Sequence, residues 1–224
     1  MKLFRSLLLL LFSVAGLVGG SIPMVAQQKV FVVEITGEVD LGLPPYVRRV
    51  IRDATEQKAA VIVFHINTFG GRVDAATEVK DAILNSTIPT VAFIDKRAIS
   101  AGALIALSCQ KIVMTPGGAI GAATPVYQSG EKASEKVVSY MRGEMRATAE
   151  RHKRNPDIAA AMVDEHFTMA DTTLKKAGQL LTLTTEEAVT VGYCDIESEH
   201  LDSALAKLGY TTIEYQHPQQ SWSE

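Results

Sequence analysis

Apolar positions in this sequence follow two alternating patterns. Some runs are apolar at nearly every position and rich in β-branched residues, which is typical of strands buried on both faces of a sheet. Between them, apolar residues recur three or four positions apart, as on one face of a helix. The expected strands are 30–35, 59–66, 90–94, 112–114 and, at a sheet edge, 211–215. The expected helices are 45–56, 73–84, 101–107, 134–152, a helical region within 154–179, a short helix from the Thr184–Glu187 capping box to about 191, and 199–208. This alternation predicts an α/β fold with a mostly parallel sheet and flanking helices.

The first 26 residues have a different pattern. Lys2 and Arg5 precede a continuous apolar stretch over 7–18, and small and polar residues follow up to Ala26. This layout is typical of a secretory leader, and the apolar run is shorter than the roughly 20 residues that a spanning helix needs. Because Met24 is larger than the residue preferred three positions before a cleavage site, we expect 1–26 to be either a cleaved signal peptide or a retained signal anchor.

The composition narrows the classes of protein to which the rest of the chain can belong. The 224 residues are 47% apolar and 21% charged, with ordinary glycine and proline contents, so we expect one folded domain at 27–216 and a polar tail at 217–224. The net charge is −3, and it becomes −5 without the two basic leader residues, which argues against nucleic-acid binding. The two cysteines, Cys109 and Cys194, form neither a zinc motif nor a disulfide framework. We expect them to be buried and inert, and we expect no metal and no cofactor.

Two glycine-rich turns follow expected strands. Residues 67–72 read Asn-Thr-Phe-Gly-Gly-Arg, and Ser100-Ala-Gly opens the helix after 90–94. Because ligands bind at the carboxyl ends of strands in open α/β sheets, both turns are candidate site segments. Ser100 would lie beside the free amides of a helix N-terminus, and the N–H groups of Gly70 and Ala101 could hold an oxyanion. The alternative is structural, since serine is also a favoured helix N-cap and small residues allow close packing.

A nucleophilic serine needs a base, and Lys136 is the better candidate for it. The residue lies near the start of the helix at 134–152, where we expect burial beside Val137 and Tyr140 to lower its pKa. The competing interpretation is a surface lysine in a charged loop. The histidines fit less well: we expect His65 to be a satisfied core residue, and the Arg-His-Lys-Arg segment at 151–154 to be a solvated helix face.

Three motifs in order resemble the Clp-protease/crotonase superfamily. They are 67–72, Ile-Ser-Ala-Gly-Ala at 99–103, and Thr-Pro-Gly-Gly-Ala-Ile-Gly-Ala at 115–122. The chain resembles NfeD-type membrane-bound serine proteases, relatives of signal peptide peptidase A, more closely, over about residues 30–215. The resemblance implies a ClpP/crotonase-like fold and an exported, membrane-associated endopeptidase with a Ser/Lys dyad. It also implies homo-oligomers (dimers or larger) on the periplasmic or extracytoplasmic face, and a polar tail that precedes membrane segments.

The resemblance also assigns roles to individual residues. Ser100 would be the nucleophile and Lys136 the base, with Gly70 and Ala101 as oxyanion donors. Gly71, Phe69, Gly121 and Ala122 would contact a hydrophobic peptide substrate, with stomatin-like membrane proteins as the implied targets. Phe69 stands where the family usually has proline, and Asn67 where it often has aspartate. Two other functions stay open: a crotonase-type acyl-CoA enzyme, which the export leader and the lack of a well-placed glutamate disfavour, and a non-catalytic scaffold that binds a stomatin-like partner.

Overall fold

A computed structural model describes residues 27–127, 129–169, 173–221 and 224. The expected leader therefore lies outside the described residues, as do two residues of the expected polar tail. Within the described ranges, none of the helices combines the length and the hydrophobicity required to cross a bilayer.

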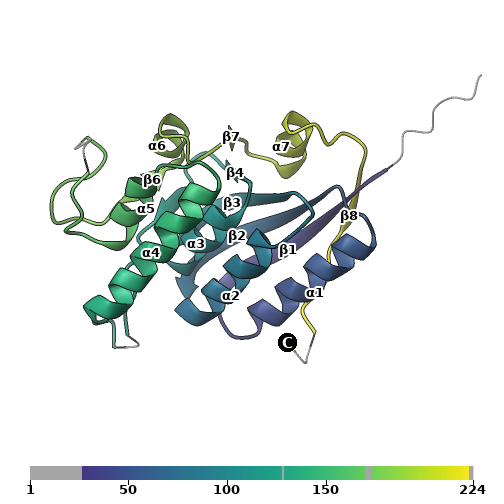
Figure 1. Ribbon diagram of the computed structural model, residues 1–224. Helices are drawn as coiled ribbons and strands as arrows, with labels where there is room; N and C mark the ends of the chain where they lie inside the picture. Colours follow the sequence, from purple (N-terminus) through teal and green to yellow (C-terminus); the bar gives the residue numbers. More distant parts are fainter. Residues whose placement is uncertain (1–26, 128, 170–172, 222–223) are drawn as a thin grey trace, which may run out of the picture.

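An eight-stranded sheet forms the centre of the fold (Figure 1). Its main path runs in the order β6-β5-β3-β2-β1-β8, and β4 joins β3 to β7 beside that path. The strands are β1 (Gln28–Val39), β2 (Val61–Gly71), β3 (Thr90–Ile99), β4 (Lys111–Met114), β5 (Ala119–Gly121), β6 (Thr182–Thr184), β7 (Ile196–Glu197) and β8 (Ile213–Gln216). All pairings are parallel except that of β5 with β6, so the predicted mostly parallel sheet is confirmed.

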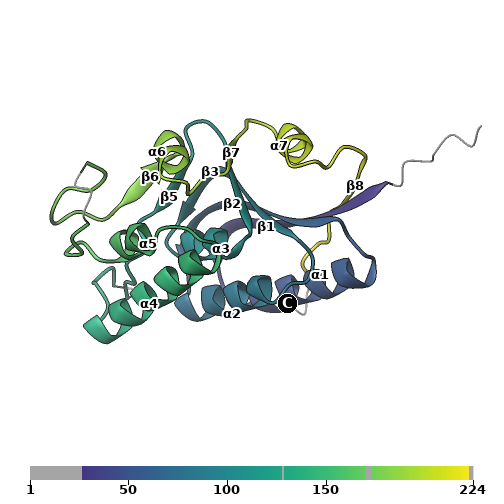
Figure 2. The same ribbon diagram turned by 45° about the horizontal axis from the view of Figure 1, so that its top comes forward.

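Helices cover both faces of this sheet. They are α1 (Leu43–Glu56), α2 (Val73–Leu84), α3 (Ala101–Ser108), α4 (Glu135–Arg151), α5 (Pro156–Val163), α6 (Thr185–Thr190) and α7 (Leu201–Lys207). Figure 2 shows α1, α2 and α4 on one side of the sheet and α6 and α7 on the other. The larger apolar core lies on the side of α1 to α5, and a smaller one lies between α7 and the first halves of the central strands. Parallel strands covered in this way explain the uninterrupted apolar runs.

The central strands are longer than the sequence pattern predicted. β2 continues through Gly71 and β3 through Ile99. The apolar pattern missed these second halves because buried residues alternate there with polar or exposed ones such as Asn67, Phe69 and Arg97. The apolar run alone therefore marks only the half of each strand that is buried on both faces. Asn67 to Gly71, expected as a turn, is strand.

Three short strands and one helix boundary were not predicted. β5, β6 and β7 have two or three residues each, too few for a period to show. Within the described part of 154–179, the expected helical region is confirmed for α5 alone, which ends at Val163 because Asp164 is extended. The capping box at Thr184 and Glu187 and the position of β8 at the sheet edge are both confirmed.

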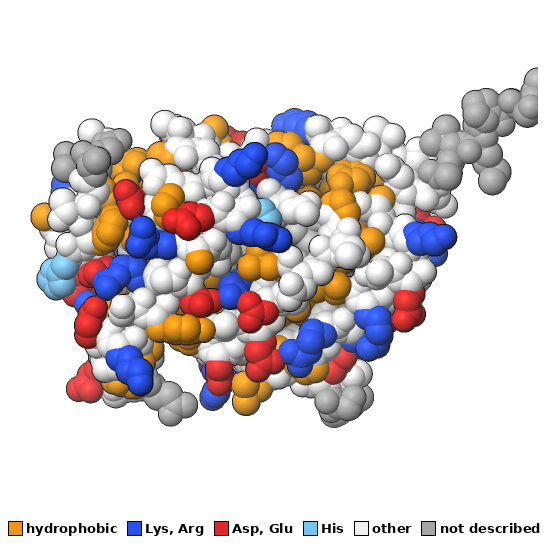
Figure 3. Space-filling model, in the orientation of Figure 1, with side chains coloured by type: hydrophobic (Ala, Val, Ile, Leu, Met, Phe, Trp, Pro, Cys, Tyr) orange, Lys and Arg blue, Asp and Glu red, His pale blue; other side chains and the backbone are white. Residues whose placement is uncertain are grey.

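The surface formed by α1, α2 and α4 carries charges of both signs. Figure 3 shows basic and acidic side chains interspersed over this face, with no broad region of one sign. Several of them pair, such as Arg48 with Glu78 and Lys80 with Glu144. This face therefore lacks the concentrated positive surface that phosphate backbones require.

Candidate functional site

Ser100 occupies a strained turn between β3 and α3. Its φ is 56° and its ψ −121°, in a region that residues other than glycine rarely adopt. Such a conformation costs of order 1–3 kcal/mol and persists only where the surrounding structure imposes it. The Ser100 N–H donates to the carbonyl of Gly121, 3.0 Å away, which ties the turn to β5. A serine on a sharp strand-to-helix turn is the geometry of a nucleophile elbow.

The loop that contains Gly70 packs directly against this serine. A Cβ on Gly70 would lie 2.5 Å from the Ser100 Cβ and 3.0 Å from its Oγ, and Gly70 has a φ of +111°. Both the closeness and the dihedral angle require glycine. The structure therefore brings together the two glycine-rich segments that the sequence singled out.

Thr68 holds the Gly70 loop in place and was missed by the sequence reasoning. The Gly70 N–H donates to the Thr68 Oγ1, 2.9 Å away, and that hydroxyl donates to the carbonyl of Gly37. Thr68 is buried, and its methyl group packs against Gly102, where an added Cβ would lie only 2.6 Å from that methyl group. Its only sequence signal was its alternation with exposed neighbours in β2. In this structure the Gly70 amide thus already has an acceptor.

The N-terminus of α3 supplies further donors beside Ser100. The Ala101 N–H belongs to the first turn of the helix, whose amides no helical carbonyl can satisfy, and it lies at the positive end of the helix dipole. Ala101 and Gly102 are both buried. An anion that forms next to Ser100 would meet this amide.

The remaining expected substrate contacts surround the same region. Phe69 is 73% exposed. Gly71 lies against the backbone of Val39, Gly121 against the carbonyl of Leu181, and the Ala122 N–H donates to that carbonyl over 3.0 Å. Gly121 and Ala122 therefore form part of the wall next to Ser100, while Phe69 projects into solvent.

Lys136 is not buried, so that part of the prediction was wrong. It lies in the first turn of α4 and is exposed, as is Tyr140, while Val137 is half-buried. The buried stripe of α4 begins at Val138, and at about 100° per residue Lys136 points some 200° away from it. Among the described residues, no hydrogen bond or ion pair joins Lys136 to Ser100 or to any other side chain. The expected base and nucleophile are thus not connected in this structure.

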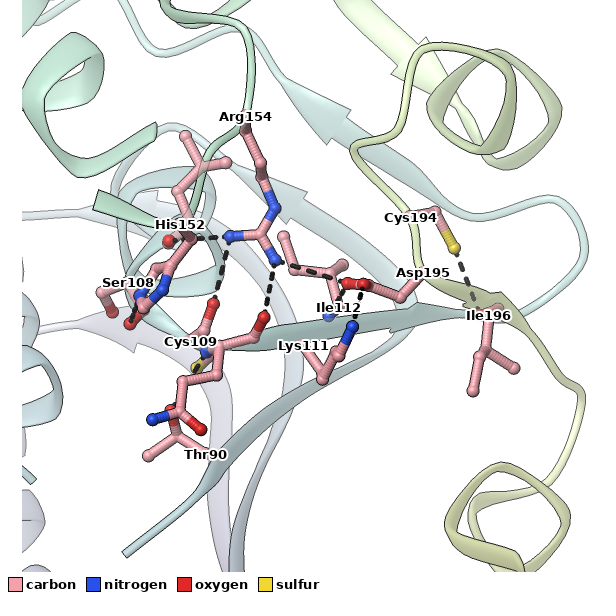
Figure 4. Close-up of polar contacts among 12 residues, drawn as sticks. Thr90, Ser108, Cys109, Lys111, Ile112, His152, Arg154, Cys194, Asp195 and Ile196 are labelled. Atoms are coloured by element: carbon pink, nitrogen blue, oxygen red, sulfur yellow. Dashed lines mark hydrogen bonds and ion pairs between the residues drawn. The ribbon is translucent and has the colours of Figure 1, made fainter. Parts of the chain in front are cut away.

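A buried polar cluster fixes the opposite end of α3 (Figure 4). The Arg154 side chain is only 4% exposed, donates to the carbonyls of Leu107, Cys109 and Gln110 at 3.1–3.3 Å, and pairs with Asp195 at 3.4 Å. The Nε2 of His152 lies 2.9 Å from the carbonyl of Ser108, and burial lowers the pKa of this histidine. The expectation of a solvated face at 151–154 was therefore wrong for these two residues, because the chain turns back beneath α3 after α4.

The other candidate residues take structural positions. His65 is half-buried at the surface end of the smaller core and pairs with Glu34 at 2.8 Å. Cys109 and Cys194 are free and buried, as expected, and burial raises the pKa of the Cys109 thiol to about 12. In the described ranges, no three His, Cys, Asp or Glu side chains are grouped so that they could hold a metal ion.

The chain is similar in sequence to NfeD proteins. A profile of the NfeD1b N-terminal domain matches residues 29–217. The membrane protein NfeD1b of Bacillus subtilis is 36% identical over 224 residues, which are all of this chain and 51% of that protein. The membrane-bound protease PH1510 of Pyrococcus horikoshii is 30% identical over 206 residues, 88% of this chain and 44% of that protease. The chain thus spans about half the length of these relatives.

Solved structures agree with this relationship. A mutant of the 1510-N membrane-bound stomatin-specific protease, with serine replaced by alanine, has a TM-score of 0.75 and 26% identity over 88% of this chain and all of its own. A lysine-to-alanine mutant in complex with a substrate peptide matches equally well, over 88% of this chain and 95% of its own. ClpP1 from Listeria monocytogenes, with a TM-score of 0.58 and 20% identity over 77% of this chain and 93% of its own, shares the fold. The predicted ClpP-like fold is confirmed.

Proposed function

The chain belongs to the NfeD1b N-terminal domain family, and on that premise we propose that it is a serine endopeptidase whose nucleophile is Ser100 and whose base is Lys136. The observation that carries the proposal is the strained Ser100 turn, held against Gly70 at the N-terminus of α3. A strained conformation that the surrounding structure imposes is typical of a functional site. The relationship to PH1510, which is named a membrane-bound protease, supports the same reaction class.

The reaction would proceed through an acyl-enzyme. The Lys136 amine takes the proton of the Ser100 hydroxyl while Oγ attacks the peptide carbonyl, and it later delivers that proton to the leaving amine. Water, with the same amine as its base, then attacks the ester, which releases the acyl product and restores the Ser100 hydroxyl. The negative charge that develops on the carbonyl oxygen is held by the amides of Ala101 and Gly70. Each such donor contributes about 3 kcal/mol to transition-state stabilisation. The Gly70 amide would exchange the Thr68 hydroxyl for the substrate oxygen as the bond forms.

Assembly of the dyad would require a rearrangement that brings the Lys136 amine, in the first turn of α4, to Ser100. Lys136 is exposed and has no bond to Ser100 in the described structure, whereas the far end of α4 is fixed by Arg154 and His152. A peptide bound along Gly121 and Ala122, or a second copy of the chain, would cover Lys136 and bring its amine to the serine. Self-association as a dimer or larger ring is thus part of the proposal.

We infer the substrate from the relatives and the location from the expected leader. The solved 1510-N protease is described as specific for a stomatin homologue, so we expect this chain to cleave hydrophobic segments of a stomatin-like membrane protein. With residues 1–26 as signal peptide or anchor, 27–216 as the protease domain and a polar tail at 217–224, it would act on the extracytoplasmic face.

A second candidate function is a non-catalytic scaffold for such a partner. The exposed position of Lys136 favours it, because an unassembled dyad cannot activate a serine. The strained serine disfavours it, since a binding surface needs no such turn.

Peptide cleavage by the chain spanning 27–224 tests the proposal and separates the two candidates. Ser100→Ala and Lys136→Ala should each abolish hydrolysis of an apolar peptide followed by liquid chromatography and mass spectrometry. Ser139→Ala and Lys132→Ala are matched controls, because both residues are exposed and lie close to Lys136 in sequence, and both variants should stay active. Full activity of Ser100→Ala would exclude the dyad. Binding of the peptide without hydrolysis by the unsubstituted chain would favour the scaffold.

A further inference from the structure

An open groove of about 590 Å³ lies beside the Ser100 turn. Its walls come from the carboxyl-terminal halves of three neighbouring strands: Glu38 of β1, the segment 67–71 of β2 and Arg97 of β3. Gly70, whose backbone contacts Ser100, is part of this wall. A peptide substrate that extends from Ser100 into this groove would therefore lie over Phe69 and Arg97.

Arg97 is fixed in this groove by an aromatic ring. Its guanidinium carbon lies 4.4 Å from the centroid of the Phe69 ring, within the range of a cation–π contact. Phe69 itself is 73% exposed, so the stacked pair forms a surface open to a ligand rather than a piece of core. Stacking restricts the arginine while its in-plane N–H donors stay available.

No carboxylate neutralises this arginine within the described part of the chain. By contrast, the partly or fully buried Arg49, Arg142 and Arg154 each pair with an acidic side chain. Glu38 lines the same groove from β1, yet among the described residues no ion pair joins it to Arg97. The groove thus has a positive wall at β3 and a negative wall at β1.

We propose that Arg97, held by Phe69, determines specificity by binding a carboxylate of the peptide substrate. The proposal rests on the proposed peptidase function. A guanidinium offers a planar fork of donors that matches a carboxylate and forms charge-assisted hydrogen bonds with it. The carboxylate is either an aspartate or glutamate side chain near the scissile bond or the C-terminus of a short peptide. The Glu38 carboxylate repels an acidic group near β1, so we expect the substrate carboxylate to bind on the side of the groove formed by Phe69 and Arg97.

Paired peptides test this assignment. A hydrophobic substrate is made with glutamate or with glutamine at each of the four positions on either side of the cleaved bond, and each peptide is made with a free and with an amidated C-terminus. For at least one position, the unsubstituted chain should show a kcat/KM about tenfold higher with the acid, which corresponds to one charge-assisted interaction. If the preference follows the free terminus instead, the terminal carboxylate is the group that is bound.

Variants then identify the residue responsible. Arg97→Met should bring the glutamate-to-glutamine ratio to about one, and Phe69→Leu should reduce it. Glu38→Gln should increase it. Lys96→Met is the matched control: it removes the same charge from the adjacent residue of β3, which is exposed and points to the other face, so the ratio should not change.

Two results would overturn the assignment: no preference at any position in the unsubstituted chain, or a preference that survives in Arg97→Met. A parallel measurement keeps it independent of catalysis. The same peptides are titrated by fluorescence anisotropy against Ser100→Ala, where the Kd ratio should show the same preference and the same loss in Ser100→Ala/Arg97→Met. If the unsubstituted chain fails to cleave but this ratio holds, the peptidase proposal fails and the carboxylate site stands.

Discussion

Replacing Arg154 by methionine should destabilise the protein severely. The Arg154 guanidinium is 4% exposed and is the donor for three carbonyls at the end of α3 as well as the partner of Asp195. Methionine fills much of the same space but donates nothing, so it removes the guanidinium donor from these carbonyls and one of the donors from the partly buried Asp195 carboxylate. Breaking a buried charge pair from one side typically costs about 3–5 kcal/mol.

Urea unfolding of a domain of this size has a slope of roughly 2 kcal/mol per molar urea, so the transition midpoint should fall by about 1.5–2.5 M. Asp195 keeps the N–H of Ile112 at 2.9 Å and Lys111 at 2.7 Å, which limits the loss to the lower part of that range.

Arg151→Met is the control for this prediction. Arg151 ends α4 three residues earlier and is exposed, so the identical substitution should change the unfolding free energy by less than about 0.5 kcal/mol. Circular dichroism reports the transition. If the two arginine variants unfold at the same urea concentration, the cluster does not stabilise the chain as argued.

Three further outcomes follow from the structure. Gly70→Ala should lose activity and about 1–3 kcal/mol of stability in urea unfolding, because its Cβ would lie 2.5 Å from that of Ser100 at a φ of +111°. The pKa of His152 is lowered by burial, so its unfolded state binds the proton more readily; the stability it contributes is present above about pH 6.5 and is lost as the pH falls through the folded pKa. His152→Gln should therefore flatten the pH dependence of the urea midpoint between about pH 7 and pH 5. Cys109 and Cys194 should not react with a thiol reagent in the native protein and should both react in denaturant, because burial raises the pKa of each thiol.

Each of these has an outcome that contradicts it. Gly143→Ala is the matched glycine control: Gly143 lies within α4 with open space around its Cβ position, so alanine should stabilise by up to about 1 kcal/mol. Equal loss in both glycine variants would refute the packing argument at Gly70. An unchanged pH profile in His152→Gln, or rapid native-state modification of either cysteine, would refute the respective burial argument.

The fold was predictable from the sequence because its signals are local. Apolar runs located the buried halves of β1, β2 and β3, and the capping box at Thr184 located the start of α6. β5 and β6 could not be predicted, since three residues show no period and their pairing depends on chain segments more than 60 residues apart.

The site was predictable only in part, for a similar reason. Ser100 and Gly70 stood out because a serine at a strand-to-helix junction lies beside free helix amides, and adjacent glycines let a backbone N–H turn outward. The hydroxyl of Thr68 and the burial of Arg154 depend on which distant backbone groups come within reach, and nothing in their neighbouring residues indicates this. For Lys136 the sequence predicted burial where the structure shows exposure. Its position next to apolar residues suggested a buried side chain, but the buried face of α4 begins at Val138 and Lys136 lies on the opposite face.

The most direct test of the central claim is covalent labelling of the unsubstituted chain with a fluorophosphonate, mapped by tandem mass spectrometry. This reagent phosphonylates serine hydroxyls that are activated as nucleophiles. We predict one adduct, on Ser100. An excess of an apolar peptide should suppress its formation, and it should be absent from Lys136→Ala. Adducts on other serines but not on Ser100, or peptide hydrolysis that continues in Ser100→Ala, would contradict the assignment of Ser100 as the nucleophile.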